Sequence, residues 1–169
     1  RSVRDDPSRR LVAGFSPIFW NTAWTNWQPP HTLGILCDPK HPALKEFPTD
    51  SHSNWQWWEI QHRSRPFILT QHPDLKPIVQ VIDDWVTNRK LGYVFEAKVG
   101  DGKLLACSAD LHLAEADAPA ALALSAALMR YVDSDRFNPS VSLPPSALDD
   151  LTKPSPVLMR NGARATASG

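Results

Sequence analysis

A chain of 169 residues with 42% hydrophobic and 21% charged residues is long enough to form one globular domain with its own core. Lys+Arg and Asp+Glu both number 18, so the net charge is zero and the basic footprint of a nucleic-acid-binding protein is missing. The longest apolar run is far shorter than the roughly 18 residues that a membrane span needs. We therefore expect neither nucleic acid nor a membrane as a partner.

The chain divides into a leader, one domain and a tail. Residues 1–10 carry four arginines and two aspartates and have little to bury, which predicts a solvated polar leader. Residues 11–152 hold the segments with strand or helix periodicity and are expected to form a single α/β domain. Residues 153–169 are polar and rich in small residues, which predicts a flexible tail.

Short apolar runs in the first half predict strands and one helical turn. Residues 32–37 are apolar and end at a turn formed by Asp38 and Pro39, which indicates a buried strand. Residues 41–48 are bracketed by prolines and have room for one helical turn. Residues 66–70 predict another short strand.

A tryptophan cluster lies between these runs, in residues 51–60. Three of the seven tryptophans fall within four positions there. A helix would place Trp55 and Trp58 on one face, whereas a strand would align Trp55, Trp57 and Glu59, and the pattern does not decide between them. Indole is a large apolar body with one N–H donor, so the cluster is either core or a platform for a flat ligand such as a sugar ring.

The second half predicts a strand, a hairpin and a helix. Residues 77–82 are nearly continuously apolar, which is typical of a strand covered on both faces. Residues 91–99 alternate apolar and polar side chains, and the Gly-Asp-Gly sequence of 100–102 turns the chain into a second apolar run over 103–109. Alternation followed by such a turn predicts a β-hairpin.

A helix is expected to begin at Asp117, which can cap its N–H groups, and to end near Ser134. Side chains at helical spacing are expected to pack this helix on the sheet; they are Ala121, Leu122, Ser125, Leu128, Met129 and Val132. The elements sum to an α/β fold of about five or six short strands with one or two packed helices. Cys37 and Cys107 lie inside apolar runs and are expected to be free thiols that fill the core.

Candidate catalytic groups are weak. Asp83 and Asp84 follow the strand at 77–82, but adjacent strand residues point to opposite faces and do not converge on one atom. Glu96 lies on the polar side of the predicted hairpin. The six histidines have no zinc-site spacing, and neither a nucleophile elbow nor a phosphate-binding glycine motif occurs. We assign no catalytic residue, metal or cofactor, and keep these three carboxylates as weak candidates.

Several separated strings together resemble the C-terminal region of bacterial glycoside hydrolases of family 2, of the β-galactosidase type. The strings are Phe15-Ser16-Pro17-Ile18-Phe19-Trp20-Asn21, Leu33-Gly34-Ile35-Leu36, His41-Pro42-Ala43-Leu44, Phe47-Pro48-Thr49, Trp55-Gln56-Trp57-Trp58, 76–83, 90–92 and 95–104. The catalytic glutamates of that family lie in a TIM barrel of about 200 residues or more. None carries over to this chain, so the resemblance implies a non-catalytic accessory domain in polysaccharide degradation, located outside the cytoplasm.

A more distant likeness concerns the glutamine-amidotransferase-like fold of the trehalose-utilisation type. A hairpin around a Gly-x-Gly turn followed by the loop Asp110-Leu111-His112 and a terminal helix is similar to the end of that fold. It implies that the chain forms part of a flavodoxin-like sheet. Such a half-sheet leaves an open edge, which implies self-association or packing on a parent enzyme.

Carbohydrate is the partner that the family-2 resemblance implies. The expected sugar-binding set combines stacking tryptophans with hydrogen-bonding side chains; it comprises Trp24, Trp27, His52, Asn54, Trp55, Gln56, Trp57 and Trp58. Two alternatives stay open. One is a small autonomous glycoside hydrolase using carboxylates from Glu59, Asp83, Asp84 and Glu96, and the other is a structural fragment whose tryptophans are core.

Overall fold

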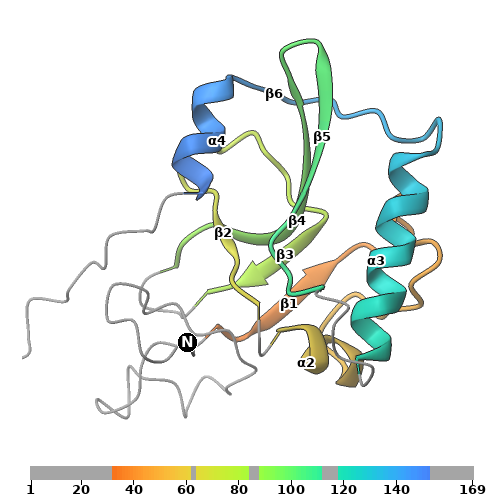
Figure 1. The fold of residues 1–169 in the computed structure, drawn as a ribbon. Helices are drawn as coiled ribbons and strands as arrows, with labels where there is room; N and C mark the ends of the chain where they lie inside the picture. The colour runs from red at the N-terminus through yellow and green to blue at the C-terminus, as the bar shows by residue number, and fades with distance from the viewer. Residues whose placement is uncertain (1–31, 62–63, 84–87, 112–117, 153–169) are drawn as a thin grey trace, which may run out of the picture.

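A computed structural model describes residues 32–61, 64–83, 88–111 and 118–152, so the predicted leader and tail lie outside the described residues. Figure 1 shows a sheet with helices on its two faces. In chain order, the elements are β1 (Gly34–Cys37), η3 (Pro42–Leu44), α2 (Trp55–Gln61), β2 (Phe67–Ile68), β3 (Val79–Ile82), β4 (Leu91–Val99), β5 (Gly102–Cys107), α3 (Pro119–Val132), β6 (Ser142–Leu143) and α4 (Pro145–Thr152).

β4 is the central strand of the six-stranded sheet. Its first half pairs with β3 and with β2, and both pairings include Leu91, so these strands lie on opposite edges of β4. Its second half pairs with β5 and with β6, and both of these pairings include Lys98. β1 completes the sheet on the outer side of β3. Except for Tyr93 at the register shift opposite β3, each residue of β4 pairs with at least one strand, which explains why β4 is buried over most of its length.

The predicted α/β fold with five or six strands and packed helices is confirmed. The sheet differs from a flavodoxin-like sheet in strand direction, because the strands of a flavodoxin-like sheet are parallel. Within the described chain, β4 and β6 are the parallel pair and the other pairings are antiparallel. Short connections such as the two-residue loop between β4 and β5 permit only antiparallel neighbours, because a parallel crossover needs a dozen residues or more.

The β4–β5 hairpin is present as predicted. Gly100 has φ +58° at the first loop position, where a left-handed conformation suits glycine. A second glycine, Gly92, has a different role, since a Cβ there would lie 2.7 Å from Cβ of Pro77. The hairpin thus depends on one glycine for its turn and on another for close contact beneath β4.

β3 is not covered on both faces, contrary to expectation. Val79 and Val81 are buried whereas Gln80 between them is exposed, which is the alternation of a strand with one face toward the core. The continuous apolar pattern arose from Ile78, which precedes β3, and from Ile82, its half-buried last residue, rather than from a second covering layer.

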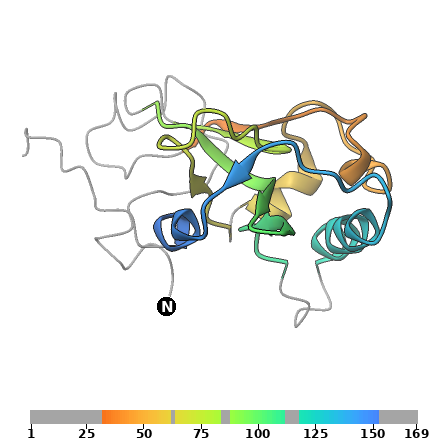
Figure 2. The same ribbon diagram turned by 90° about the horizontal axis from the view of Figure 1, so that it is seen from above.

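Two apolar clusters form the core, one on each side of the hairpin. The larger one packs α2, α3 and η3 against β1, β3 and the first half of β4, and the smaller one packs α4 against β6 and the second half of β4. Leu105 and Cys107 of β5 join the larger cluster, while Leu104 and Ala106 join the smaller. Figure 2 shows α3 and α4 on either side of the hairpin, in keeping with this division.

Helix α3 is present, but its buried face differs from the predicted one. The buried side chains include Leu124, Ala127 and Tyr131, which the prediction omitted, while Leu122 and Met129 are exposed. The reason is that α3 packs mainly against η3 and α2 and reaches the sheet through Tyr131 and Glu96, so its buried arc is turned toward those two elements. Asp117 lies outside the described residues.

Candidate functional site

Helix α2 presents two tryptophans to the surface and buries the third. Trp55 is 88% exposed and Trp58 is 45% exposed, whereas Trp57 is 0% exposed. Residues three apart in a helix lie on the same side, so the open choice between helix and strand is resolved in favour of paired Trp55 and Trp58. We call these two residues the α2 indole pair.

Trp57 anchors the helix from below. Its Nε1 donates to Oγ1 of Thr49 at 2.7 Å, and its ring meets the edge of Phe47 with centroids 5.2 Å apart and planes at 75°. A buried indole held by one hydrogen bond and one edge-to-face contact is a core residue. Trp57 is therefore removed from the predicted sugar-binding set, because its side chain has no exposed surface that a ligand could contact.

Two of the three predicted hydrogen-bonding residues, Gln56 and Asn54, make side-chain hydrogen bonds within the protein. Gln56 donates from Nε2 to the carbonyl oxygen of Pro48 at 2.5 Å. Asn54 donates from Nδ2 to Oδ2 of Asp50 at 3.4 Å, and its Oδ1 is buried without a partner among the described residues. His52 is exposed and forms an isolated β-bridge with Leu36. His52 is thus the side chain of this set most open to a ligand.

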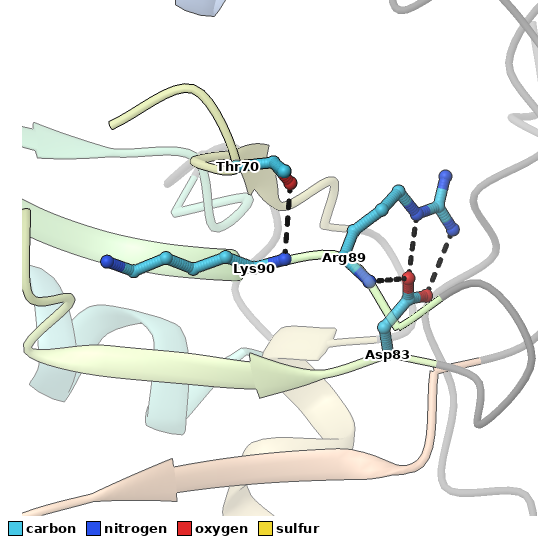
Figure 3. Close-up of polar contacts among 4 residues, drawn as sticks. All are labelled: Thr70, Asp83, Arg89 and Lys90. Carbon is cyan, nitrogen blue, oxygen red and sulfur yellow. Dashed lines mark hydrogen bonds and ion pairs between the residues drawn. The ribbon is translucent and has the colours of Figure 1, made fainter. Parts of the chain in front are cut away.

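Asp83 is a structural residue. It is buried at the end of β3 and accepts three hydrogen bonds from Arg89, namely from the backbone N at 2.8 Å, from Nε at 2.7 Å and from Nη2 at 2.9 Å. Figure 3 shows this bidentate pair, with the N–H of Lys90 next to it donating to Oγ1 of Thr70. Both carboxylate oxygens are occupied, so Asp83 holds the chain entering β4 and has no free oxygen directed at a substrate.

The remaining described carboxylates of the hydrolase alternative are also engaged. Glu96 accepts a hydrogen bond from the hydroxyl of Tyr131 at 2.7 Å, and burial followed by this contact raises the pKa of Tyr131 above its usual range. Glu59 of α2 accepts from the N–H groups of Ala120 and Ala121 at 2.9 and 3.1 Å. Glu59 thereby caps the first turn of α3, a role that sequence analysis assigned to Asp117.

Asp84, Trp24 and Trp27 lie outside the described residues. Sequence analysis missed Arg89 as the partner of Asp83, although a basic residue six positions after an acidic one across a loop is a visible signal. It also missed the Glu59 cap, for which one sequence carries no signal, because the helix it caps lies sixty residues further on.

A shallow groove lies between η3 and the end of α3. Its volume is about 230 Å³, and it is lined by Pro42, Lys45, Glu46, Ala127, Arg130, Tyr131, Ser134 and Arg136. Glu46 and Arg130 form an ion pair across it. The groove has a mixed polar and apolar lining and is open to solvent, and the α2 indole pair contributes no lining residue.

Both cysteines are free thiols, as expected. Burial raises the pKa of Cys107 to about 11 and also raises that of Cys37, so neither is a thiolate at neutral pH. Within the described ranges, no group of three or more His, Cys, Asp or Glu side chains is arranged to hold a metal ion. None of the described helices has the length and apolar character required to cross a membrane.

A family model described as a domain of unknown function, DUF8487, matches residues 3–153. The chain belongs to this family. The match includes every described element from β1 to α4, so the sheet, the α2 indole pair and the hairpin all lie within the family's domain. No curated protein matches the chain.

Proposed function

We propose that the chain is a non-catalytic accessory domain that binds carbohydrate through the α2 indole pair. The observation that carries the proposal is the exposure of Trp55, at 88%, beside a partly exposed Trp58 on the same side of one helix. Large aromatic side chains are buried on average, so leaving two next to one another on the surface is unfavourable unless a ligand covers them.

The support given by Trp57 is geometric. Because Trp57 is buried and hydrogen-bonded directly beneath, α2 is held in place before any ligand arrives. Side chains three apart on a helix have Cβ atoms about 5–6 Å apart, which is close to the size of a pyranose ring. The exposed indole pair, with the exposed His52 three residues before Trp55, suits the apolar face and the hydroxyl groups of a sugar.

The accessory role rests on the carboxylates and on the family-2 resemblance. Asp83, Glu96 and Glu59 each make hydrogen bonds that stabilise the fold. A general acid or nucleophile needs a carboxylate that can approach the glycosidic bond. The domain would then act beside a parent enzyme, outside the cytoplasm, by holding polysaccharide near that enzyme's active site.

Titration with soluble β-glucan, galactan and xylan, followed by tryptophan fluorescence and calorimetry, tests the proposal. Trp55→Ala is expected to weaken binding at least tenfold, a loss of about 1.4 kcal/mol. Met129→Ala removes an exposed apolar side chain from another helix and is the matched control. It is expected to bind sugar as tightly as the unmodified chain does. Unchanged fluorescence at millimolar sugar, or equal binding by both variants, would refute the proposal.

A nitrophenyl-glycoside panel distinguishes the accessory domain from an autonomous hydrolase. The parent chain is expected to show no turnover. Turnover that disappears in Glu96→Gln while Glu46→Gln retains it would establish catalysis and overturn the accessory assignment; Glu46 is the control because it is an exposed carboxylate in an ion pair.

A further inference from the structure

The outer edge of β5 has no partner strand within residues 32–61, 64–83, 88–111 and 118–152. Among the described residues, β5 pairs with β4 alone. In a hairpin with a two-residue loop, the residues flanking the loop form a hydrogen-bonded pair, and every second residue after them bonds to the same neighbour. The N–H of Ser108 donating to the carbonyl of Tyr93 has this phase. The N–H and C=O groups of Lys103, Leu105 and Cys107 therefore point outward.

This edge lacks the features that protect exposed strands. The β4–β5 register is continuous from Val99↔Gly102 to Val94↔Cys107, without a bulge. β5 contains no proline, and its one charged side chain, Lys103, turns back to donate to the carbonyl of Phe137 at 2.7 Å. Natural proteins use bulges, prolines and inward-pointing charges to block edge pairing. A continuous, largely apolar edge without these features is suited to accept another strand.

An apolar stripe on α3 lies on the same side of the molecule. Leu122 is 41% exposed and Met129 is 63% exposed, and helical periodicity places Val132, also exposed, on the same flank. Arg130, on the opposite flank, pairs with Glu46 just after η3. η3 follows β1, at the far end of the sheet from β5. The stripe therefore faces away from η3 and from the buried side of α3. Figure 2 shows that α3 itself lies beside the hairpin.

We propose that the β5 edge and the α3 stripe together bind a second copy of this chain. Antiparallel pairing of β5 with itself, with Leu105 opposite Leu105 of the second copy, satisfies the outward groups of Lys103, Leu105 and Cys107 in both chains. The two-fold axis of such a pair is perpendicular to the sheet, so the two α3 helices fall on the same face and their stripes meet.

A second copy fits this surface because the surface is self-complementary. In this register Leu105 meets its own counterpart on the α3 face, and Leu104 lies opposite Ala106 on the α4 face. The chain's net charge is zero, so no overall repulsion opposes association. A standard interface needs about 800 Å² from each partner, more than a strand edge offers, and the α3 stripe enlarges the contact on the same side.

Analytical ultracentrifugation tests the stripe. The parent chain is expected to sediment as a dimer at tens of micromolar, and Leu122→Glu combined with Met129→Glu is expected to shift it to a monomer. Ala123→Glu is the matched control, because this exposed residue lies on the flank of Arg130, and it is expected to stay dimeric. A monomeric parent, or a dimer that persists in the double variant while circular dichroism shows it folded, overturns the proposal.

Disulfide trapping tests the register independently. In a background of Cys37→Ser and Cys107→Ala, Leu105→Cys is expected to form an intermolecular disulfide on mild oxidation, because directly opposed Cα atoms lie about 5.5 Å apart. Leu104→Cys is the control, since in this register its two copies are diagonal, about 7–8 Å apart. Cross-linking at Leu104 but not at Leu105, or at neither, contradicts self-pairing in this register.

Discussion

β1 and β5 lie at opposite ends of the sheet, and the described chain covers the outer edge of only one of them. Along β1, the N–H of Cys37 donates to the carbonyl of Ser51 at 3.0 Å and the N–H of Ile35 donates to Oγ of Ser53 at 2.8 Å. Along β5, the outward groups have no such partners among the described residues. The comparison shows that a strand edge is covered by the same chain when the segment after the strand is held beside it, as residues 51–53 are held beside β1.

The anchor on the β1 side is Trp57, and its loss has the largest expected effect. Trp57→Ala is expected to lower the free energy of unfolding by about 3–5 kcal/mol, because it leaves a cavity and frees the segment that covers β1. Urea denaturation measures the loss. Trp55→Ala serves as the control and is expected to change stability by no more than about 0.5 kcal/mol. Equal losses would mean that Trp57 has no special anchoring role.

On the β5 side, Cys107 gives a pH dependence. Its folded pKa of about 11 is above its ordinary value of 9.0, so the folded state keeps the thiol proton while the unfolded state loses it. Stability should be unaffected by this group below pH 9 and should fall by about 2 kcal/mol as the pH rises toward 11. The difference between the parent and Cys107→Ala across this range isolates the effect from other groups. Parallel curves would contradict it.

Ser53→Ala removes one hydrogen bond from the covered edge of β1. The N–H of Ile35 would be left without its partner inside the protein, at an expected cost of about 1–2 kcal/mol. Amide hydrogen exchange at Ile35 should accelerate in parallel. Ser51→Ala is the control, because Ser51 contributes its backbone carbonyl to this edge, and it should behave like the parent. Faster exchange in the control alone would show that the Ser53 hydroxyl is dispensable.

Gly100→Ala has the smallest expected effect and acts on the hairpin that presents β5. No atom lies within 4 Å of a Cβ placed at Gly100, so the cost comes only from its φ of +58°, and we expect about 1 kcal/mol. Gly100→Asn should cost less, because asparagine tolerates this conformation better. Thermal denaturation of both variants measures the difference, and a larger loss in the asparagine variant would refute the backbone explanation.

Local patterns in the sequence were sufficient for elements that depend on local contacts. The hairpin follows from alternation over Leu91–Val99 and from glycine at the turn, both of which act between neighbours. The existence of α3 follows from its composition and from Pro119 in its first turn. The sequence of α3 does not determine which of its sides is buried, because that side is set by contacts with η3 and α2, which come from distant parts of the chain.

The site was harder to predict for the same reason. Whether residues 55–61 form a helix depends on the pocket that receives Trp57, which Phe47 and Thr49 supply. The sequence indicated an aromatic cluster but did not separate its buried member from its exposed ones. Likewise, the contact of Glu96 with Tyr131 joins a strand to a helix, and no spacing rule connects them.

The position of β6 has a consequence for the order of folding. β6 pairs with the far end of β4 through Lys98↔Ser142 and Val99↔Leu143, although α3 lies between the two strands in the chain. During synthesis, β4 and β5 can form their hairpin long before β6 emerges, so the second half of β4 stays unpaired on one side until almost the whole domain has been translated. Late closure of a long-range contact is slow and leaves an intermediate able to pair wrongly.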